Sequence, residues 1–171
     1  MTAYAALLRA VNVGGTSKLP SAELKSMGDA CGFDQVRTFI ASGNLLFASD
    51  LGEAAVRKAI EAQVEARFGR YVPVLVRSAA EMAALADGNP FPERPGNRVA
   101  ALFVDEKPTQ AMIDAARHVV DERMALGTRA IYIAYDDAGM GTSKLMLPAM
   151  KTGTTRNMNS VTKMAALLAE M

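Results

Sequence analysis

Two hydrophobic periods alternate along the first half of the chain, and they predict a mixed α and β structure. Short runs of small and branched apolar side chains are typical of strands; they are residues 4–11, 36–41, 45–48 and 72–76. Apolar side chains three to four positions apart predict amphipathic helices; these cover residues 20–31 and 53–68. The first 78 residues therefore predict the order β-α-β-β-α-β, the ferredoxin-like unit.

The second half continues as a looser variant of the first. Helices are expected at residues 79–86, 109–124 and 159–169, with strands at residues 98–104 and 129–135. The helix over residues 109–124 is expected to turn inward a set of apolar side chains: Met112, Ile113, Ala116, Val119 and Val120. We predict an α+β fold of two halves, residues 1–78 and 79–171, packed into one compact unit.

The composition excludes several classes of function but does not identify the function of the protein. The chain has 171 residues and a formal net charge of +1, so it is not a nucleic-acid binder held by overall charge. Its single cysteine, Cys31, excludes an internal disulfide and a cysteine-based metal cluster, and its helical spacing predicts a core position. MTAYAALLRAV lacks a signal-peptide pattern, and no run approaches the ~20 apolar residues of a membrane span. We expect a cytoplasmic protein with no membrane contact.

The pentapeptide GTSKL occurs twice, at residues 15–19 and 141–145. The flanking sequences differ, so the repeat is local. The first copy follows a predicted strand and precedes a predicted helix, but it lacks the second glycine and the Ser/Thr of a P-loop, and the G-x-G-x-x-G pattern is also absent. A glycine turn with hydroxyls, a lysine and a helix start still favours anions. The alternative is a structural turn with Lys18 in solvent.

Topology predicts that two such turns are neighbours. In a β-α-β-β-α-β unit, the end of the first strand and the hairpin between the second and third strands open on the same edge of the sheet. We therefore expect residues 12–18 to lie beside Ser42, Gly43 and Asn44, which would give a donor-rich rim.

Three ordered motifs resemble the bacterial family known as domain of unknown function 1697 (DUF1697). They are LLRAVNVGGTSKLPSAELKSMGDACGF, VRTFIASGNLLF and TGTTRNMNSVTKMAAL, and the resemblance extends over essentially the whole chain. It implies two ferredoxin-like halves and no established activity. Ala10, Met158 and Ser160 stand where the family pattern has glycine, tryptophan and threonine. If the tryptophan stacks on a ligand in relatives, Met158 has lost that role; if it is a core residue, Met158 fills the space.

The segment Thr154-Thr155-Arg156-Asn157 has two interpretations. It precedes the last helix, whose N-cap is expected at Asn159 or Ser160, so Arg156 is either a structural residue paired with a carboxylate or a bidentate anion ligand helped by Thr155. Whether this segment lies near the first rim is not determined by the sequence.

Several familiar catalytic arrangements are absent from the sequence. The only histidine, His118, is expected on a helix as an exposed partner of Asp114, which leaves no Ser/His/Asp set. Asp136-Asp137 is better explained by a turn than by a metal site. Ser160-Val161-Thr162-Lys163 fits S-x-x-K, but its companion motifs are missing. We predict no metal site, and the sequence identifies neither a cofactor nor a reaction.

Our hypothesis is a rim that binds a phosphate-bearing small molecule or a nucleotide. The expected site residues are Asn12, Gly14, Gly15, Lys18, Ser42, Asn44, Lys144, Thr155, Arg156 and Asn157. The alternative is a non-enzymatic module that binds nucleic acid or protein. Against nucleic acid, only 6% of residues are aromatic, and the expected strands have almost no aromatic side chains on which bases could stack. A third possibility is that the motifs are purely architectural.

Overall fold

The computed structural model describes residues 1–12, 17–136 and 139–171, and Val13, Gly14, Gly15 and Thr16 lie outside them. The chain divides into two compact units, Met1–Met82 with Met164–Met171, and Ala83–Lys163. We describe each unit by itself, and the predicted division after residue 78 stays a prediction. Among the described residues, none of the helices has the length and apolar content needed to cross a bilayer.

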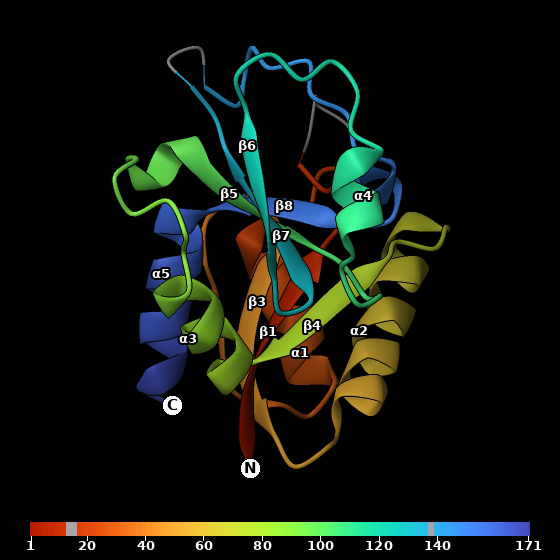
Figure 1. Cartoon of the computed structure of the whole chain (residues 1–171). Coiled ribbons are helices and arrows are strands. Elements are labelled where there is room, and N and C mark those ends of the chain that lie inside the picture. Colours follow the sequence, from red (N-terminus) through yellow and green to blue (C-terminus); the bar gives the residue numbers. More distant parts are fainter. Residues whose placement is uncertain (13–16, 137–138) are drawn as a thin grey trace. The chain divides into compact units, whose positions relative to one another are not determined.

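The first unit contains a four-stranded sheet in the order β2-β3-β1-β4, and all neighbouring strands are antiparallel. Its elements are β1 (Thr2–Leu8), α1 (Ser21–Ala30), β2 (Asp34–Thr38), β3 (Asn44–Ser49), α2 (Glu53–Phe68) and β4 (Val74–Ser78) (Figure 1). The predicted order β-α-β-β-α-β over the first 78 residues is confirmed. β1 lies at the centre, where Ala6 pairs with Leu45 of β3 and with Val76 of β4.

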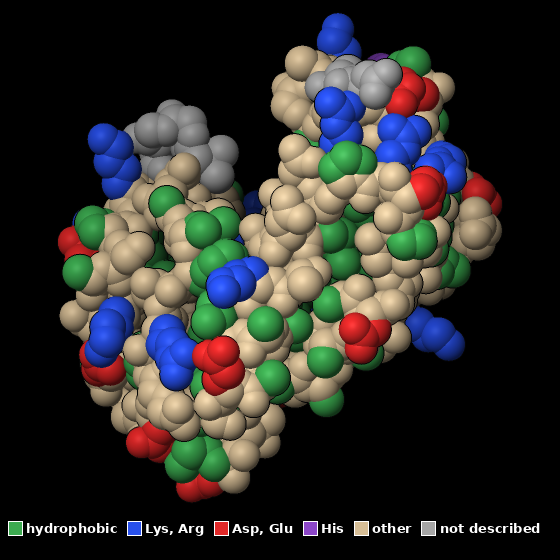
Figure 2. Space-filling view, turned by 90° about the vertical axis from the view of Figure 1, so that its left-hand side faces the viewer, with side chains coloured by type: hydrophobic (Ala, Val, Ile, Leu, Met, Phe, Trp, Pro, Cys, Tyr) green, Lys and Arg blue, Asp and Glu red, His purple; other side chains and the backbone are tan. Residues whose placement is uncertain are grey.

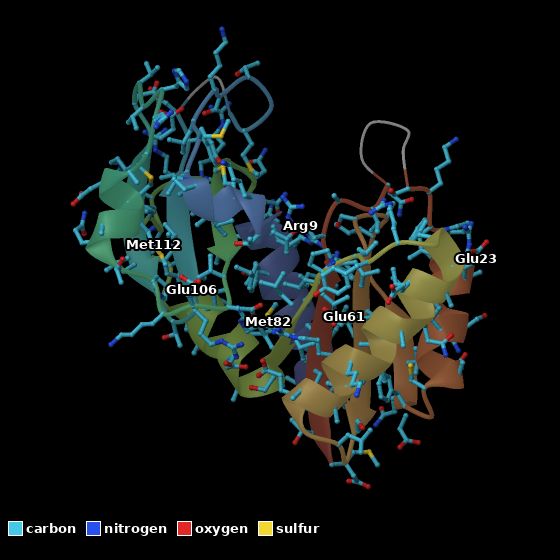
Figure 3. All side chains as sticks on the ribbon, turned by 90° about the vertical axis from the view of Figure 1, so that its right-hand side faces the viewer. Arg9, Glu23, Glu61, Met82, Glu106 and Met112 are labelled. Carbon is cyan, nitrogen blue, oxygen red and sulfur yellow. The ribbon has the colours of Figure 1, made fainter. Side chains whose placement is uncertain are left out.

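One face of this sheet packs against both helices. Alternate side chains of β1 enter the same core as the apolar stripes of α1 and α2, and Phe33 stacks on Phe47 of β3 with ring centroids 4.2 Å apart. Cys31 is partly buried against this core, which is the position predicted for it, and burial raises the pKa of its thiol. Glu61 of α2 (Figure 3) fixes the segment that leads into β4, because its carboxylate accepts hydrogen bonds from the Tyr71 hydroxyl and the Val74 N–H.

The hairpin between β2 and β3 differs in detail from its prediction. β2 begins at Asp34 and ends at Thr38, so the turn covers residues 39–43 instead of residues 42–44. The pairing of β2 with β3 also has a register shift between Asp34 and Arg37, where Gln35 has a φ of 51°. Gly43 closes the turn at a φ of 79°, and its carbonyl accepts a hydrogen bond from the Leu8 N–H at 2.9 Å.

The second unit also has a four-stranded antiparallel sheet, in the order β6-β7-β5-β8. Its strands and short helices are β5 (Val99–Phe103), α4 (Gln110–Asp114), β6 (Arg123–Gly127), β7 (Ala130–Ala134) and β8 (Thr154–Asn157), with 3-10 turns η1 (Gly96–Arg98) and η2 (Pro148–Lys151). Two longer helices, α3 (Ala79–Asp87) and α5 (Met158–Ala169), each contribute residues to both units. Side chains of β5 and β7 form the core with Leu145 and Leu147, and Met112 of α4 (Figure 3) packs against it.

The predicted helix over residues 109–124 is wrong. α4 ends at Asp114, and Val119 and Val120 are 48% and 85% exposed instead of buried. The chain leaves the helix because the backbone of Arg117 pairs with that of Met146 in both directions, at 2.8 and 3.0 Å. It then enters β6, which pairs with β7 through residues 123–127. Tertiary pairing thus overrides a helical apolar spacing.

The last predicted helix begins earlier than expected, at Met158, and a strand precedes it. Thr154–Asn157 forms β8 against β5, so this segment is part of the sheet. The N-cap is Asn157, whose side-chain oxygen accepts a hydrogen bond from the Ser160 N–H at 2.9 Å, and not Asn159 or Ser160. Met158 is only 3% exposed, which favours the core interpretation of this position.

Gly43→Ala is expected to destabilise the protein more than Gly32→Ala. Both glycines have positive φ, 79° and 75°, which costs a β-carbon about 1 kcal/mol. A methyl at Gly43 would also collide with the Val11 side chain and approach the Leu8 Cβ to 3.1 Å, which adds about 1–3 kcal/mol of overpacking. Urea denaturation of both variants measures the difference. Equal losses of stability would contradict the described turn.

Candidate functional site

The two copies of the pentapeptide lie beside different cavities, one in each unit. The first cavity, here called the rim cavity, is lined by Asn12, Lys18, Leu19, Pro20, Ser21 and Ala41 and has a volume of about 360 Å³. The second, the loop cavity, has a volume of about 380 Å³ and lies in the second unit. It is lined by residues 118–122, Tyr135, Asp136, Gly139, Thr142, Ser143 and Lys144.

Asn12 fixes the geometry of the rim cavity. Its side-chain amide donates hydrogen bonds to the carbonyls of Leu19 at 2.9 Å and Ala41 at 2.5 Å, and its oxygen accepts from the Leu19 N–H at 2.7 Å. These bonds join the segment before α1 to the turn between β2 and β3, so the two turns that topology placed at one rim are neighbours. They also occupy the amide of Asn12, which gives this residue a bracing role.

Ser42 and Asn44 support the rim from behind. Asn44 has no solvent exposure, and its amide donates to the Phe39 carbonyl at 2.9 Å and to the Ser42 hydroxyl at 3.0 Å. A buried amide that satisfies carbonyls of its own turn stabilises that turn. Of the predicted rim residues, only Lys18 has an exposed side chain at the cavity, while Gly14 and Gly15 lie outside the described residues.

Lys18 stands next to the beginning of α1. The helix starts at Ser21 after Pro20, and no described side chain caps its first turn. Ser17 accepts a hydrogen bond from Arg70, and the Arg67 side chain binds the first-turn carboxylate of Glu23 at 2.7 Å. The first N–H groups of a helix carry partial positive charge, and Lys18 lies beside them while the Glu23 carboxylate is paired with Arg67.

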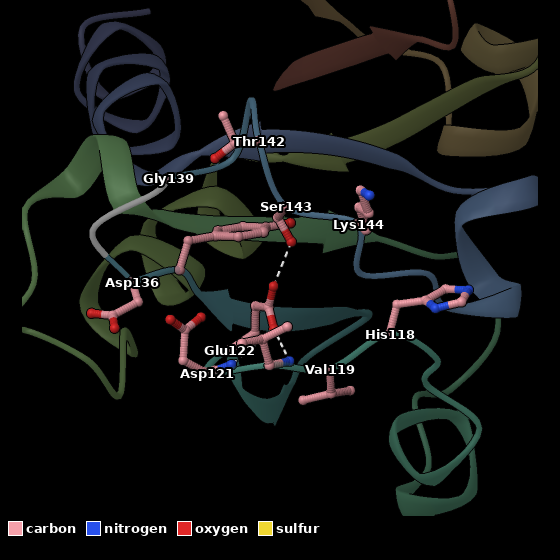
Figure 4. A pocket seen from close by; sticks show the side chains of 11 residues that line it. His118, Val119, Asp121, Glu122, Asp136, Gly139, Thr142, Ser143 and Lys144 are labelled. Carbon is pink, nitrogen blue, oxygen red and sulfur yellow. Dashed lines mark hydrogen bonds between the residues drawn. The ribbon is translucent and has the colours of Figure 1, made fainter.

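The loop cavity has a different charge pattern (Figure 4). Asp121 and Asp136 lie at one end of it, and Lys144 and His118 lie at the other. The Tyr135 side chain is 6% exposed and forms part of the wall. The second pentapeptide therefore brings its lysine, Lys144, to a cavity that also contains acidic groups.

A buried carboxylate ties the walls of the loop cavity together. Glu122 is 9% exposed and accepts hydrogen bonds from the Ser143 hydroxyl at 2.5 Å and from the Val120 N–H at 2.8 Å (Figure 4). The bond from Ser143, followed by that from Val120, holds the pKa of Glu122 below its ordinary value. Glu122 is therefore charged at neutral pH, and the segment that carries Lys144 is clamped to residues 118–122.

Asp121 and Asp136 are carboxylates with like charge at one end of this cavity. Partial loss of water around the Asp121 carboxyl group is the main cause that raises its pKa. The hydrogen bond and the negative charge of Asp136 raise this pKa further. Asp136 also forms an ion pair with Arg94 at 2.9 Å. Because two neighbouring carboxylates repel each other, this end of the cavity favours a cation.

The remaining predicted site residues belong to the sheet of the second unit. Arg156 is 7% exposed and donates to the Thr154 hydroxyl at 2.7 Å and to the Thr155 carbonyl at 3.0 Å. Burial lowers the pKa of its guanidinium to about 10. Asn157 caps α5. These contacts give Arg156, Thr155 and Asn157 structural roles in this unit, and Asn12, Lys18, Ser42 and Asn44 lie in the other unit.

Sequence reasoning missed the residues that give the loop cavity its character. The predicted pair of Asp114 and His118 on one helix is wrong, because α4 ends at Asp114 and His118 follows it at a φ of 58°. Asp121, Glu122 and Tyr135 were not predicted as site residues. The sequence did carry one relevant signal, the turn at Gly127-Thr128-Arg129 between two apolar runs, which indicates a hairpin in place of a long helix. Among the described residues, no group of acidic, histidine and cysteine side chains is placed to hold a metal ion.

Comparison with known proteins supports the first two sequence motifs, whereas the third, at residues 152–167, lies beyond the residues that the family model matches. The family model described as protein of unknown function (DUF1697) matches residues 1–132. A solved structure, that of a conserved bacterial protein from Streptococcus pneumoniae, superposes with a TM-score of 0.79 at 24% identity over 98% of each chain. This likeness shows the fold alone. No curated protein matches the chain.

Glu122→Gln is expected to lower the stability at pH 7 by about 1–2 kcal/mol, because the hydrogen bonds from Ser143 and Val120 would end on a neutral amide. The pKa of Glu122 is lowered by folding, so its stabilising effect is present above its ordinary value of 4.5 and is lost as the pH falls through the lower folded value. The difference between wild type and variant should therefore shrink in acid. Urea denaturation from pH 7 to pH 3 measures it.

The matched control is Glu65→Gln, which changes an exposed carboxylate of α2. This variant should unfold like the wild type at every pH. A Glu122→Gln protein that also does so would show that the clamp contributes nothing to stability.

Proposed function

The chain belongs to the DUF1697 family of proteins of unknown function, and we propose that its first unit binds a phosphate-bearing small molecule or a nucleotide at the rim cavity. The observation that carries this proposal is the uncapped start of α1 beside Lys18. The second-unit residues Lys144, Thr155, Arg156 and Asn157 are left out of the proposed site.

Helix α1 supplies the proposed anion contacts through its backbone. It has ten residues, and its first N–H groups, from Ser21 onward, have no carbonyl within the helix to bind. Three such donors at the positive end of a helix favour a phosphate or carboxylate group. Lys18 lines the same cavity, and its flexible side chain would bring an ammonium group to the negative charge of the bound phosphate.

A fixed loop supports binding because less order has to be created when the ligand arrives. The Asn12 side chain holds both the segment at Leu19 and the turn at Ala41, so the rim is braced without a ligand. Asn44 braces the same turn from the interior. In this proposal the asparagines shape the cavity, and the backbone of α1 and Lys18 contact the anion.

Burial of the central strands argues against the nucleic-acid alternative. RNA recognition on a sheet of this order uses exposed aromatic side chains on the middle strands. Here β1 is buried from Tyr4 to Leu8, and all six residues of β3 are buried. Basic and acidic side chains are also interspersed on the face shown in Figure 2, whereas a nucleic-acid surface favours a continuous basic patch.

Two broader statements belong to the same proposal. We describe both units as ferredoxin-like, which is supported by the equivalent strand orders β2-β3-β1-β4 and β6-β7-β5-β8. The second unit departs from that pattern because its longer helix, α5, follows β8 instead of preceding it.

We also place the protein in the cytoplasm, where a free thiol such as Cys31 is stable.

Ser21→Pro tests the backbone contact directly. Proline is well tolerated at the first position of a helix, and Pro20 already has the φ of −59° and ψ of 145° that a following proline requires. The variant should keep the helix but lose one N–H donor, which should weaken pyrophosphate or ADP binding about threefold to tenfold. Titration followed by the amide NMR signals of residues 22–24, which wild type and variant both have, measures this.

Matched controls separate the backbone contact from other effects. Ser21→Ala keeps the N–H and should bind like the wild type. Lys18→Ala should weaken binding, while Lys58→Ala, which removes an exposed lysine of α2 away from the cavity, should not. The proposal fails if neither anion shifts the signals of residues 22–24, or if the Lys18 and Lys58 variants lose affinity equally.

A further inference from the structure

We propose that the loop cavity of the second unit binds a short zwitterion such as a dipeptide, with its ammonium group at Asp121 and Asp136 and its carboxylate at Lys144. This site is separate from the rim cavity and does not depend on the function proposed for it. Its volume of about 380 Å³ suits a small organic ligand.

The first argument is the segregation of charge. The acidic pair lies at one end of the cavity, and Lys144 and His118 lie at the other (Figure 4). A simple anion would face Asp121, Asp136 and the charged Glu122, and a simple cation would face Lys144. A ligand that carries one charge of each sign at its two ends satisfies both walls.

The second argument is the apolar surface between these ends. Val119 and Val120, which are 48% and 85% exposed, line the cavity, and Tyr135 also lines it. Small-ligand sites are typically apolar walls with a few placed polar groups. The two exposed valines give a peptide side chain such as that of leucine an apolar surface to cover.

The third argument is that Asp121 and Asp136 lie together at one end of the cavity, where an ammonium group would face both carboxyl groups (Figure 4). Partial loss of water, followed by the hydrogen bond and the charge of the neighbouring Asp136 carboxyl group, raises the pKa of Asp121. Arg94 binds Asp136 from one side and does not line the cavity. An ammonium group bound to Asp121 would relieve the remaining repulsion.

The fourth argument is preorganisation. Glu122 binds the Ser143 hydroxyl at 2.5 Å and the Val120 N–H at 2.8 Å, so the wall that carries Lys144 and the wall that carries the valines are joined before any ligand is present. The Ser143 hydroxyl also accepts a hydrogen bond from the Leu145 N–H, and Leu145 is anchored in the core. Such a site loses little conformational entropy on binding.

The test uses glycyl-leucine and two derivatives in calorimetric titrations of the full chain. N-acetyl-glycyl-leucine lacks the ammonium group, and glycyl-leucinamide lacks the carboxylate. Each derivative should bind about fivefold to tenfold more weakly than glycyl-leucine, which corresponds to the loss of one solvent-accessible hydrogen bond.

Protein variants then assign each end of the ligand. Asp121→Asn should weaken glycyl-leucine and glycyl-leucinamide but not the acetylated peptide. Lys144→Met should weaken glycyl-leucine and the acetylated peptide but not the amide. Asp114→Asn and Lys107→Met change exposed charges of the same unit that do not line the cavity, and they should bind like the wild type.

Three results would overturn the proposal: no binding of glycyl-leucine, equal binding of all three peptides, or equal losses in the control variants. If only the ammonium group and Asp121 matter, the cavity is an amine site and the zwitterion proposal is wrong. Ser21→Pro should leave glycyl-leucine binding unchanged, so failure at this cavity and failure at the rim cavity are distinguishable.

Discussion

Each unit is organised by a central strand that is buried on both faces. The four residues Ala5, Ala6, Leu7 and Leu8 of β1 have no exposed surface, and neither have the five residues of β5. A strand in this environment must pair on both edges, because an unpaired backbone group away from water costs free energy. β1 therefore lies between β3 and β4, and β5 lies between β7 and β8.

The two copies of the pentapeptide have similar surroundings in the two units. In both copies the leucine is a core residue, Leu19 in the first unit and Leu145 in the second, and the lysine before it is exposed. In both copies the serine hydroxyl makes a hydrogen bond, Ser17 with Arg70 and Ser143 with Glu122. A buried leucine fixes the end of a loop, and its neighbours then hold a lysine at the mouth of a cavity.

The first unit could be predicted well from the sequence because its signals are local. Helix α2 begins at Glu53 and ends at Phe68, as its apolar spacing and Gly69 predict, with Gly69 at a φ of 70°. The second unit was harder because non-local pairing decides its structure. Residues 115–122 have helical spacing, yet Arg117 pairs with Met146 and Glu122 receives the Ser143 hydroxyl. Neither contact has a signature within a short window of sequence.

The predicted site shows the same division. The rim was predictable because strand order alone brings Asn12 to Ala41. The roles of Asn12, Asn44 and Arg156 were not, because an amide or a guanidinium in a polar motif has the same sequence whether it contacts a ligand or its own backbone. Burial separates these cases: Asn44 has no exposure and Arg156 has 7%, whereas Lys18 and Lys144 remain exposed.

Although the net charge of the chain is only +1, the rim cavity and the loop cavity have different local arrangements of charge. At the rim cavity, Lys18 and the uncapped amides of α1 add to each other, and the acidic group nearby, Glu23, is paired with Arg67. At the loop cavity, Lys144 and the acidic pair oppose each other across an apolar wall. Fields between exposed charges fade over about 10 Å at ordinary salt, so each cavity is selective through its own few charges. The two proposed ligands, an anion at the rim cavity and a zwitterion at the loop cavity, differ for this reason.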